Sequence, residues 1–380
     1  DATNNNIYHH NIYIKKDTKM VNFKTENSCA VVTGGGDGMG LQIALALVSN
    51  GCSVCICDIS QQRLDAAAAQ LHASVTKEHA GNIIISTKVC DVANEEAVND
   101  LVRHVVQTHY LKDKTLLLFN NAGVGGGNSL VASSRKDWDR TFAIDWGGVL
   151  NCTRSFLPIM MTLPAAHIVN TSSICGFTYH MGYLKPNVSY SAAKAAVRGF
   201  TLALVEDFKL NAPHIKATCV MPGWIGTGLI ASSQELMASG QISQIRKSNA
   251  HMIKRIAELE KEGDVATMKL KRDGLLSQYK VDLSQFTDQQ LQQVMTRAET
   301  FRTDALTTAK QAANIILNGV LKNQSQVLVG EDADAIDNIM RTNPIGFYED
   351  TSIMPDFFNF PQWEMNRKKS EVKKKVASKM

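Results

Sequence analysis

Short apolar runs alternate with longer amphipathic stretches from residue 28 onward. The apolar runs are nearly continuous, which is typical of parallel strands that helices cover on both faces. We predict strands at 29–33, 53–57, 83–90, 116–119, 167–171, 216–221 and 326–330. Helical patterns lie at 40–49, 60–79, 94–109, 135–161, 190–211 and 303–322. This order predicts an α/β fold with a doubly wound parallel β-sheet, a Rossmann fold, in one catalytic domain over 28–342.

Three segments depart from the alternation. Residues 228–302 are polar and helix-rich, with apolar spacing at Met252, Ile256 and Leu259, and predict a helical insertion that caps the substrate before the last helix and strand. Residues 1–27 are polar and predict a disordered extension, with Met20 as an alternative natural start. Residues 343–380 are first aromatic and then basic; we expect the aromatic part to cover the body or a partner subunit.

Composition narrows the class of protein. Of 380 residues, 44% are hydrophobic and 20% are charged, and there is no apolar run of membrane-spanning length, so we expect no membrane span. The net charge is +4, but residues 367–380 carry +6, which leaves −2 on the remainder and predicts no nucleic-acid partner. We expect a cytoplasmic protein. The final Ser378, Lys379 and Met380 resemble a peroxisomal address and keep that alternative open.

Three of the eight cysteines, Cys52, Cys55 and Cys57, lie in one apolar run. Their Cys-x-x-Cys spacing could supply half of a metal site, but no second His or Cys pair completes it. We therefore predict buried thiols in a reducing compartment and no metal.

The stretch "TGGGDGMG" (33–40) follows the first strand and opens a helix. This is the context in which glycines let the backbone approach a pyrophosphate and a helix N-terminus offers unpaired N–H groups. Asp58 ends the second strand, where a carboxylate can bind both adenosine ribose hydroxyls and would repel a 2′-phosphate. We predict NAD as the preferred cofactor. NADP remains possible, with Arg63 as the nearest cation.

Five further motifs follow in order: "CDV" (90–92), "NNAG" (120–123), "NTSSICG" (170–176), "YSAAK" (190–194) and "PGWIGT" (222–227). Together with the TGxxxGxG loop, these motifs, which include the Tyr-x-x-x-Lys pair in "YSAAK", resemble the short-chain dehydrogenase/reductase family over about 28–227. The resemblance continues over 303–330. The resemblance implies an oxidoreductase that transfers hydride between a nicotinamide cofactor and a small-molecule secondary alcohol or ketone.

The resemblance also implies site residues. It assigns Tyr190 as the acid/base, Lys194 as its partner and Ser173 as the catalytic serine, because Gly176 fixes the Ser-x-x-Gly register and so excludes Ser172. With Asp58, the implied cofactor-binding residues are Thr33, Gly34, Gly36, Asp37, Gly38, Met39, Gly40, Ile59, Asp91, Val92, Asn120, Ala122, Gly123, Tyr190, Lys194, Pro222, Gly223, Ile225 and Thr227.

Asp145 is the main departure from the family pattern, which places a catalytic asparagine at that position. In relatives this asparagine helps to hold a water near the catalytic lysine. Its backbone carbonyl survives the change to aspartate, so we keep Asp145 in the catalytic set. We expect an ionised Asp145 to offset part of the charge of Lys194.

The proposed chemistry requires a tyrosine of unusual acidity. A free tyrosine has a pKa of about 10, too high for a base near neutrality. A lysine ammonium about 4–5 Å away stabilises tyrosinate by roughly 3–4 kcal/mol and lowers the pKa by about two to three units. We expect Lys194 to act on Tyr190 in this way, while Ser173 donates a hydrogen bond to the substrate oxygen.

Substrate identity is less constrained. The candidate substrate contacts are Ser173, Ile174, Phe177, His180, Tyr183 and Trp224, with Val124 as a further pocket residue. They favour a bulky hydrophobic secondary alcohol or ketone. The apolar continuation of the 190–211 helix favours a homodimer or homotetramer. A dinucleotide-binding sensor or scaffold without turnover is the alternative function; it would keep the glycine loop and Asp58 without needing Ser173, Tyr190 and Lys194.

Overall fold

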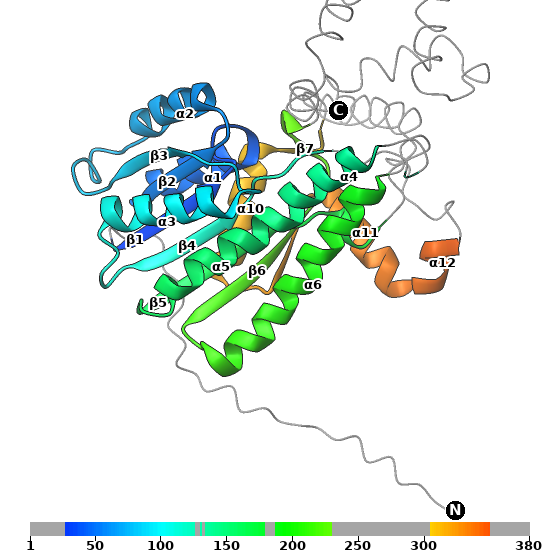
Figure 1. The fold of residues 1–380 in the computed structure, drawn as a ribbon. Helices are drawn as coiled ribbons and strands as arrows, with labels where there is room; N and C mark the ends of the chain where they lie inside the picture. Colours follow the sequence, from blue (N-terminus) through cyan, green and yellow to red (C-terminus); the bar gives the residue numbers. More distant parts are fainter. Residues whose placement is uncertain (1–26, 126–129, 131–133, 179–186, 230–304, 350–380) are drawn as a thin grey trace, which may run out of the picture.

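The computed structural model describes residues 27–125, 130, 134–178, 187–229 and 305–349 (Figure 1). The predicted N-terminal extension, almost all of the predicted insertion and most of the C-terminal tail lie outside these residues, as do His180 and Tyr183. No helix within the described ranges is long and apolar enough to cross a membrane.

A seven-stranded parallel sheet forms the centre of the molecule. Its order is β3-β2-β1-β4-β5-β6-β9, which confirms the doubly wound Rossmann arrangement. The strands are β1 (Ser28–Thr33), β2 (Ser53–Asp58), β3 (Ile85–Val89), β4 (Thr115–Asn120), β5 (Ala165–Thr171), β6 (Ile215–Pro222) and β9 (Gln326–Val329). The order reverses between β1 and β4, and this switch point is where such sheets bind ligands, outside the carboxyl ends of their strands.

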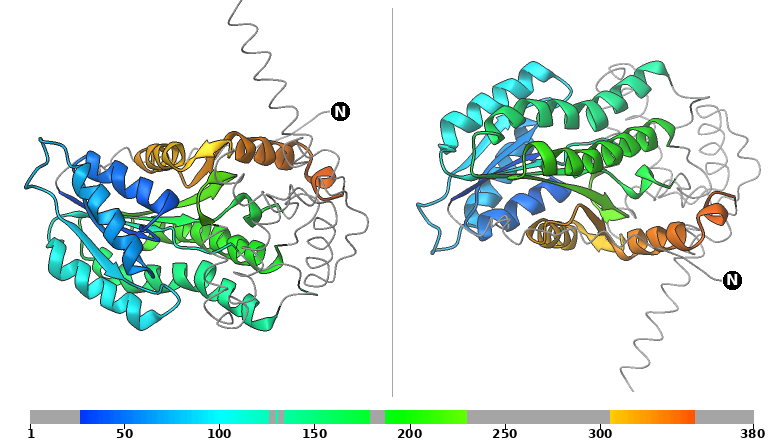
Figure 2. Two further views of the ribbon diagram at one scale, coloured as in Figure 1. Left: turned by 90° about the horizontal axis from the view of Figure 1, so that it is seen from above. Right: turned by 90° about the horizontal axis from the view of Figure 1, so that it is seen from below.

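Helices cover both faces of the sheet, as the two views of Figure 2 show. One face carries α1 (Gly38–Ser49), α2 (Gln61–Ala73) and α10 (Ala309–Leu321). The other carries α3 (Glu95–His109), α5 (Gly148–Met160) and α6 (Val188–Asn211). This double coverage explains why the strand sequences are apolar throughout rather than alternating.

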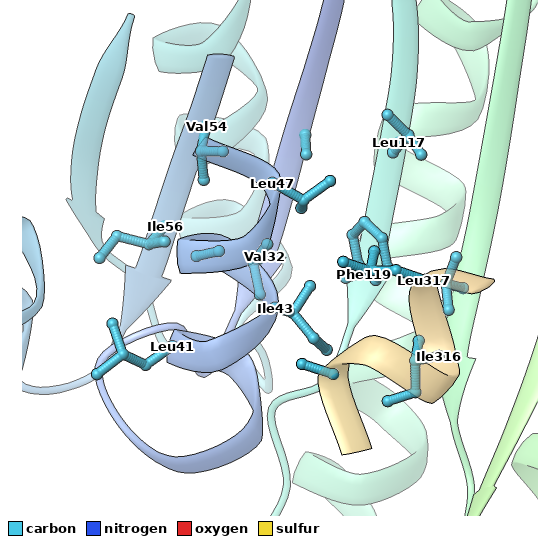
Figure 3. Close-up of a cluster of buried hydrophobic side chains, with 14 of the residues drawn as sticks. Val32, Leu41, Ile43, Leu47, Val54, Ile56, Leu117, Phe119, Ile316 and Leu317 are labelled. Carbon is cyan, nitrogen blue, oxygen red and sulfur yellow. The ribbon is translucent and has the colours of Figure 1, made fainter. Parts of the chain in front are cut away.

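The core on the α1 face is drawn in Figure 3. Leu47 of α1, Phe119 of β4 and Ile316 of α10 are almost completely inaccessible to solvent. Full burial of such a side chain stabilises the fold by about 1.5–3 kcal/mol, so this packing fixes α1 and the glycine loop before it against the sheet. All eight cysteines are buried and none forms a disulfide, which confirms the prediction of buried thiols.

Three predicted helices have different boundaries, and the helix predicted over 60–79 ends at Ala73 as α2. The predicted 135–161 helix is divided into α4 (Arg135–Phe142), a π-helical turn η1 (Ala143–Gly147) and α5. The helix predicted from 303 begins at Ala309, because the Thr308 hydroxyl accepts a hydrogen bond from the backbone N–H of Gln311 and the Gln311 side chain accepts one from the Thr308 N–H.

A short strand pair and a helix lie close to the carboxyl end of β6. The two-residue strand β7 (Ile225–Gly226) pairs in parallel with β8 (Thr307–Thr308), which directly precedes α10. Helix α11 (Glu331–Thr342), not predicted from the sequence, follows β9. After it, α12 (Pro344–Glu349) places Phe347, part of the predicted aromatic tail, in a buried cluster with Met221.

Candidate active site

The glycine loop between β1 and α1 is closely packed. Gly34 has φ +62°, a conformation that favours glycine, and a Cβ there would lie 2.9 Å from the Cα of Ala122. A Cβ on Gly40 would collide with the carbonyl of Gly34. Asp37 caps α1 by accepting a 2.7 Å hydrogen bond from the N–H of Gly38. The sequence therefore needs glycine at Gly34 and Gly40 to bring this loop against the one that follows β4.

Asp58 fastens the glycine loop to the end of β2. One carboxylate oxygen accepts a 3.3 Å hydrogen bond from the N–H of Gly36, and the other accepts a 3.0 Å bond from the N–H of Ser60. Ile59 beside it is 49% exposed. Asp91 is exposed just beyond β3, the strand next to β2. The predicted adenosine-binding residues therefore lie at adjacent strand ends.

Thr33 forms hydrogen bonds with the loop after β4. Its hydroxyl accepts 3.0 Å hydrogen bonds from the N–H groups of both Asn121 and Ala122. The Asn121 side chain in turn donates to the carbonyl of Thr33, at 3.0 Å. Asn121 lines the pocket and was not among the predicted site residues, which include its neighbour Asn120.

Asn120 lies below the pocket rather than along it. Its amide donates to the side chains of Asn170, at 2.8 Å, and Thr153, at 3.2 Å, and Asn170 donates onward to Thr201. This buried network joins β4 and β5 to α5 and α6. The two asparagine side chains have different surroundings because Asn120 is the last residue of the strand, whereas Asn121 begins the loop.

Two adjacent serines follow β5 and have different hydrogen-bond partners. The Ser172 hydroxyl donates a 2.7 Å hydrogen bond to the carbonyl of Lys194 and so bonds to the backbone of α6. The Ser173 hydroxyl accepts a 3.2 Å bond from the N–H of Cys175, and a hydrogen bond with Ser173 lowers the pKa of Tyr190. The geometry therefore places Ser173 beside the tyrosine, in the register that its sequence motif predicts.

The ammonium of Lys194 is held between two oxygen atoms. It donates a 3.2 Å hydrogen bond to the carbonyl of Thr171 and lies 3.3 Å from Oδ1 of Asp145. Asp145 is fully buried in the π-helical turn, and the same oxygen accepts a 3.0 Å bond from the N–H of Val124. Burial raises the pKa of Asp145, and the nearby charge of Lys194 opposes that rise.

The pKa of Tyr190 is shifted in the direction opposite to the predicted one. Burial raises the pKa of Tyr190 well above its usual value, and Cys175 and the negative charge of Asp145 raise it further. The lowering by Lys194 that we predicted is therefore wrong for the protein alone. The physical reason is burial, which disfavours the charged phenolate, while the ammonium of Lys194 lies 5.5 Å from the centre of the tyrosine ring and faces the Asp145 carboxylate.

These residues enclose one pocket at the carboxyl ends of the central strands. It brings together Ser173, Tyr190, Lys194 and Asp145 with many of the predicted cofactor residues. The latter are Gly34, Asp37, Gly38, Met39, Ala122, Gly123, Pro222, Gly223, Ile225 and Thr227. Arg63 and Val124 also line it.

Other predicted residues lie elsewhere. Thr33, Gly36, Gly40, Asp58, Ile59, Asp91 and Val92 support or adjoin the pocket without lining it. Ile174 and Phe177, predicted to contact substrate, pack instead in the buried cluster that contains Phe347, because the short 3-10 turn η2 (Ile174–Gly176) directs the chain toward α11. Trp224 does not line the pocket, and its backbone N–H bonds to Asp332.

The family model for short chain dehydrogenases matches residues 28–238, more than half of the chain. The chain belongs to the short chain dehydrogenase family. This membership confirms the resemblance seen in the sequence and makes the protein an oxidoreductase by family.

Three individual proteins are similar to this chain over different lengths. The oxidoreductase SadH of Mycobacterium tuberculosis is 28% identical over 316 residues, covering 83% of this chain and 91% of SadH. The 3-oxoacyl-[acyl-carrier-protein] reductase FabG of Thermotoga maritima is 28% identical over 222 residues, covering 58% of this chain and 84% of FabG. A short chain dehydrogenase/reductase of Burkholderia phymatum in complex with NAD shares the fold, with TM-score 0.59, 24% identity and coverage of 83% and 95%.

Proposed function

We propose that this short chain dehydrogenase is an NAD(P)-dependent alcohol dehydrogenase or carbonyl reductase with Tyr190 as the acid/base. One observation carries the proposal: Ser173, Tyr190 and Lys194 meet in the same pocket as the glycine loop. A nucleotide-binding scaffold needs the glycine loop but has no use for a serine, a tyrosine and a buried lysine brought together beside it. This favours an enzyme over the sensor alternative.

The residues present fit a dinucleotide. Gly34 and Gly38, both with positive φ, line the pocket at the start of α1, where N–H groups and the helix dipole favour a pyrophosphate. Asp58 would hold the adenosine ribose, and Pro222, Ile225 and Thr227 would hold the nicotinamide end. When bound, this cofactor supplies or accepts the hydride.

We expect NAD to be preferred over NADP. The Asp58 carboxylate would repel a 2′-phosphate. Arg63 and Asp58 both lie beside Gly36. A Cβ on Gly36 would lie 2.9 Å from Asp58 Oδ2 and 2.8 Å from Arg63 Cβ. The position of Arg63 beside Asp58 is the observation that keeps NADP possible as a second cofactor.

The raised pKa of Tyr190 favours the acid role near neutral pH. A protonated phenol can donate a proton to the oxygen of a carbonyl as that oxygen gains negative charge, and Ser173 can donate a hydrogen bond to the same atom. In the opposite direction the phenol must first lose its proton, so alcohol oxidation should need a higher pH. We propose that the substrate is a bulky hydrophobic ketone or secondary alcohol, and that the enzyme is a cytoplasmic homodimer or homotetramer.

A paired measurement tests this function. The purified protein is titrated with NADH and NADPH and then assayed with a panel of ketones and secondary alcohols, beside Tyr190→Phe. We expect the variant to bind NADH within about threefold of the parent and to lose turnover by at least about 10²-fold, the usual contribution of acid–base catalysis. Tyr110→Phe, at an exposed tyrosine, is the matched control.

Two results would contradict the proposal. Turnover that persists in Tyr190→Phe would exclude its acid–base role. Tight cofactor binding without turnover of any compound on the panel would support the scaffold alternative instead.

A further inference from the structure

Asp332 is a buried carboxylate that the chemistry above does not use. It lies in the first turn of α11 and is 2% exposed. One oxygen, Oδ2, accepts a 2.5 Å hydrogen bond from the backbone N–H of Trp224, and the other, Oδ1, is buried without a hydrogen-bond partner among the described residues. A carboxylate is costly to bury, so this side chain is held in place for a specific contact.

The backbone around Asp332 is shaped to admit the carboxylate. A Cβ on Gly223 would overlap both carboxylate oxygens, so only glycine leaves room there. A Cβ on Gly330 would lie 2.5 Å from Oδ1, and Gly330 has φ +110°, which again favours glycine. The Gly223 N–H donates a 2.9 Å hydrogen bond to the carbonyl of Val329. Together these contacts fix the end of β6 to the start of α11.

The segment held in this way is the pocket-lining turn 222–227. Pro222, Gly223, Ile225 and Thr227 all line the pocket. Asp332 supports the turn at Trp224, and β8 pairs with it at Ile225 and Gly226. Thr227 also approaches the glycine loop, since a Cβ on Gly38 would lie 3.3 Å from the Thr227 Cβ.

We propose that Asp332 is a positioning residue that sets the 222–227 turn for the nicotinamide end of the cofactor. It lies outside residues 28–238, the part of the chain that the family model matches. The inference rests on the proposed function, because it takes this turn as the nicotinamide side of the pocket. The adenosine side, at Asp58 and Asp91, lies at the ends of β2 and β3, two strands that are not adjacent to β6.

The experiment compares two ligands. NADH spans the whole site, whereas AMP carries only the adenosine half, so loss of Asp332 should weaken the first and spare the second. We expect Asp332→Ala to raise the Kd for NADH at least about tenfold and to leave the Kd for AMP within about twofold, by isothermal titration calorimetry. Asp332→Asn keeps an oxygen acceptor for the Trp224 N–H, and we expect it to restore the NADH Kd to within about threefold.

Asp334→Ala is the matched control. Asp334 is exposed in the same first turn of α11, so its loss changes the helix charge without touching the turn. The control should leave both Kd values within about twofold of the parent. If Asp332→Ala is not folded by circular dichroism, Asp332→Ser, too short to reach the Trp224 N–H, replaces it under the same criteria.

The outcomes separate the two proposals. Equal effects of Asp332→Ala on NADH and AMP, or no effect on either, would overturn the positioning role. An asparagine variant as weak as the alanine variant would overturn it too. Failure of the parent protein to bind NADH or NADPH would instead refute the proposed function.

Discussion

The Lys194 ammonium lies 3.3 Å from Oδ1 of Asp145, and both side chains are buried. Within the part of the chain that the structure describes, the second carboxylate oxygen of Asp145 has no hydrogen-bond partner. Because charges interact strongly away from water, the carboxylate compensates the ammonium and at the same time raises the pKa of Tyr190. Asp145 is therefore one of the groups, after burial and Cys175, that raise the pKa of Tyr190.

Asp145→Asn should move the pH dependence of activity to lower pH. Asparagine removes the negative charge that raises the pKa of Tyr190, so tyrosinate should form at lower pH. We expect the rising limb of alcohol oxidation, measured as kcat/KM against pH, to shift to lower pH. Asp139→Asn, at an exposed aspartate on α4, is the control and should leave the profile in place. A profile that moves upward or does not move would contradict this account of the pair.

Gly123→Ala should disturb the same pair by steric means. A Cβ on Gly123 would lie 2.6 Å from Asp145 Oδ1 and 3.3 Å from Lys194 Nζ. We expect turnover to fall at least about tenfold and the free energy of unfolding to fall by about 1–3 kcal/mol, measured by urea denaturation. Gly199→Ala, in α6 with open space around its Cβ, is the control and should stabilise the protein by about 0.5–1 kcal/mol. Unchanged turnover in Gly123→Ala would show that the pair tolerates displacement.

The two serines after β5 should respond differently to alanine. Ser173→Ala should reduce kcat by about 10²-fold with little change in stability, because its hydroxyl is the one beside Tyr190. Ser172→Ala should lower the free energy of unfolding by about 1 kcal/mol through loss of the 2.7 Å hydrogen bond to Lys194. Kinetics and urea denaturation on both variants test this assignment. The reverse pattern would make Ser172 the catalytic serine.

Asp58→Asn should relax the choice between cofactors. The amide oxygen can still accept a backbone hydrogen bond at the glycine loop, while the charge that repels a 2′-phosphate is gone. We expect the ratio of the NADPH Kd to the NADH Kd to fall by about tenfold or more, measured by fluorescence titration of both cofactors. Asp65→Asn, at an exposed aspartate on α2, is the control. A constant ratio would mean that Asp58 does not discriminate.

Much of the fold was predictable because the signals are local. Apolar runs bounded by turn residues predict buried strands, and the alternation of strand and helix predicts a parallel sheet. The π-helical turn at Asp145 was not predictable, since its sequence reads as one continuous helix with α4 and α5. The start of α10 was missed because a capping threonine inside a polar run carries a weak signal.

The sequence alone determined the family, the glycine loop and the identity of Ser173, Tyr190 and Lys194, because these residues lie in short motifs with fixed spacing. Tertiary structure decided which atoms face one another. It separated Asn120 from Asn121, moved Ile174 and Phe177 away from the pocket, and placed Asp332 behind the 222–227 turn. It also reversed the expected shift in the pKa of Tyr190. The physical reason is that a motif fixes residue types along the chain, whereas burial and charge compensation depend on contacts such as that of Asp145 with Lys194, which are distant in sequence.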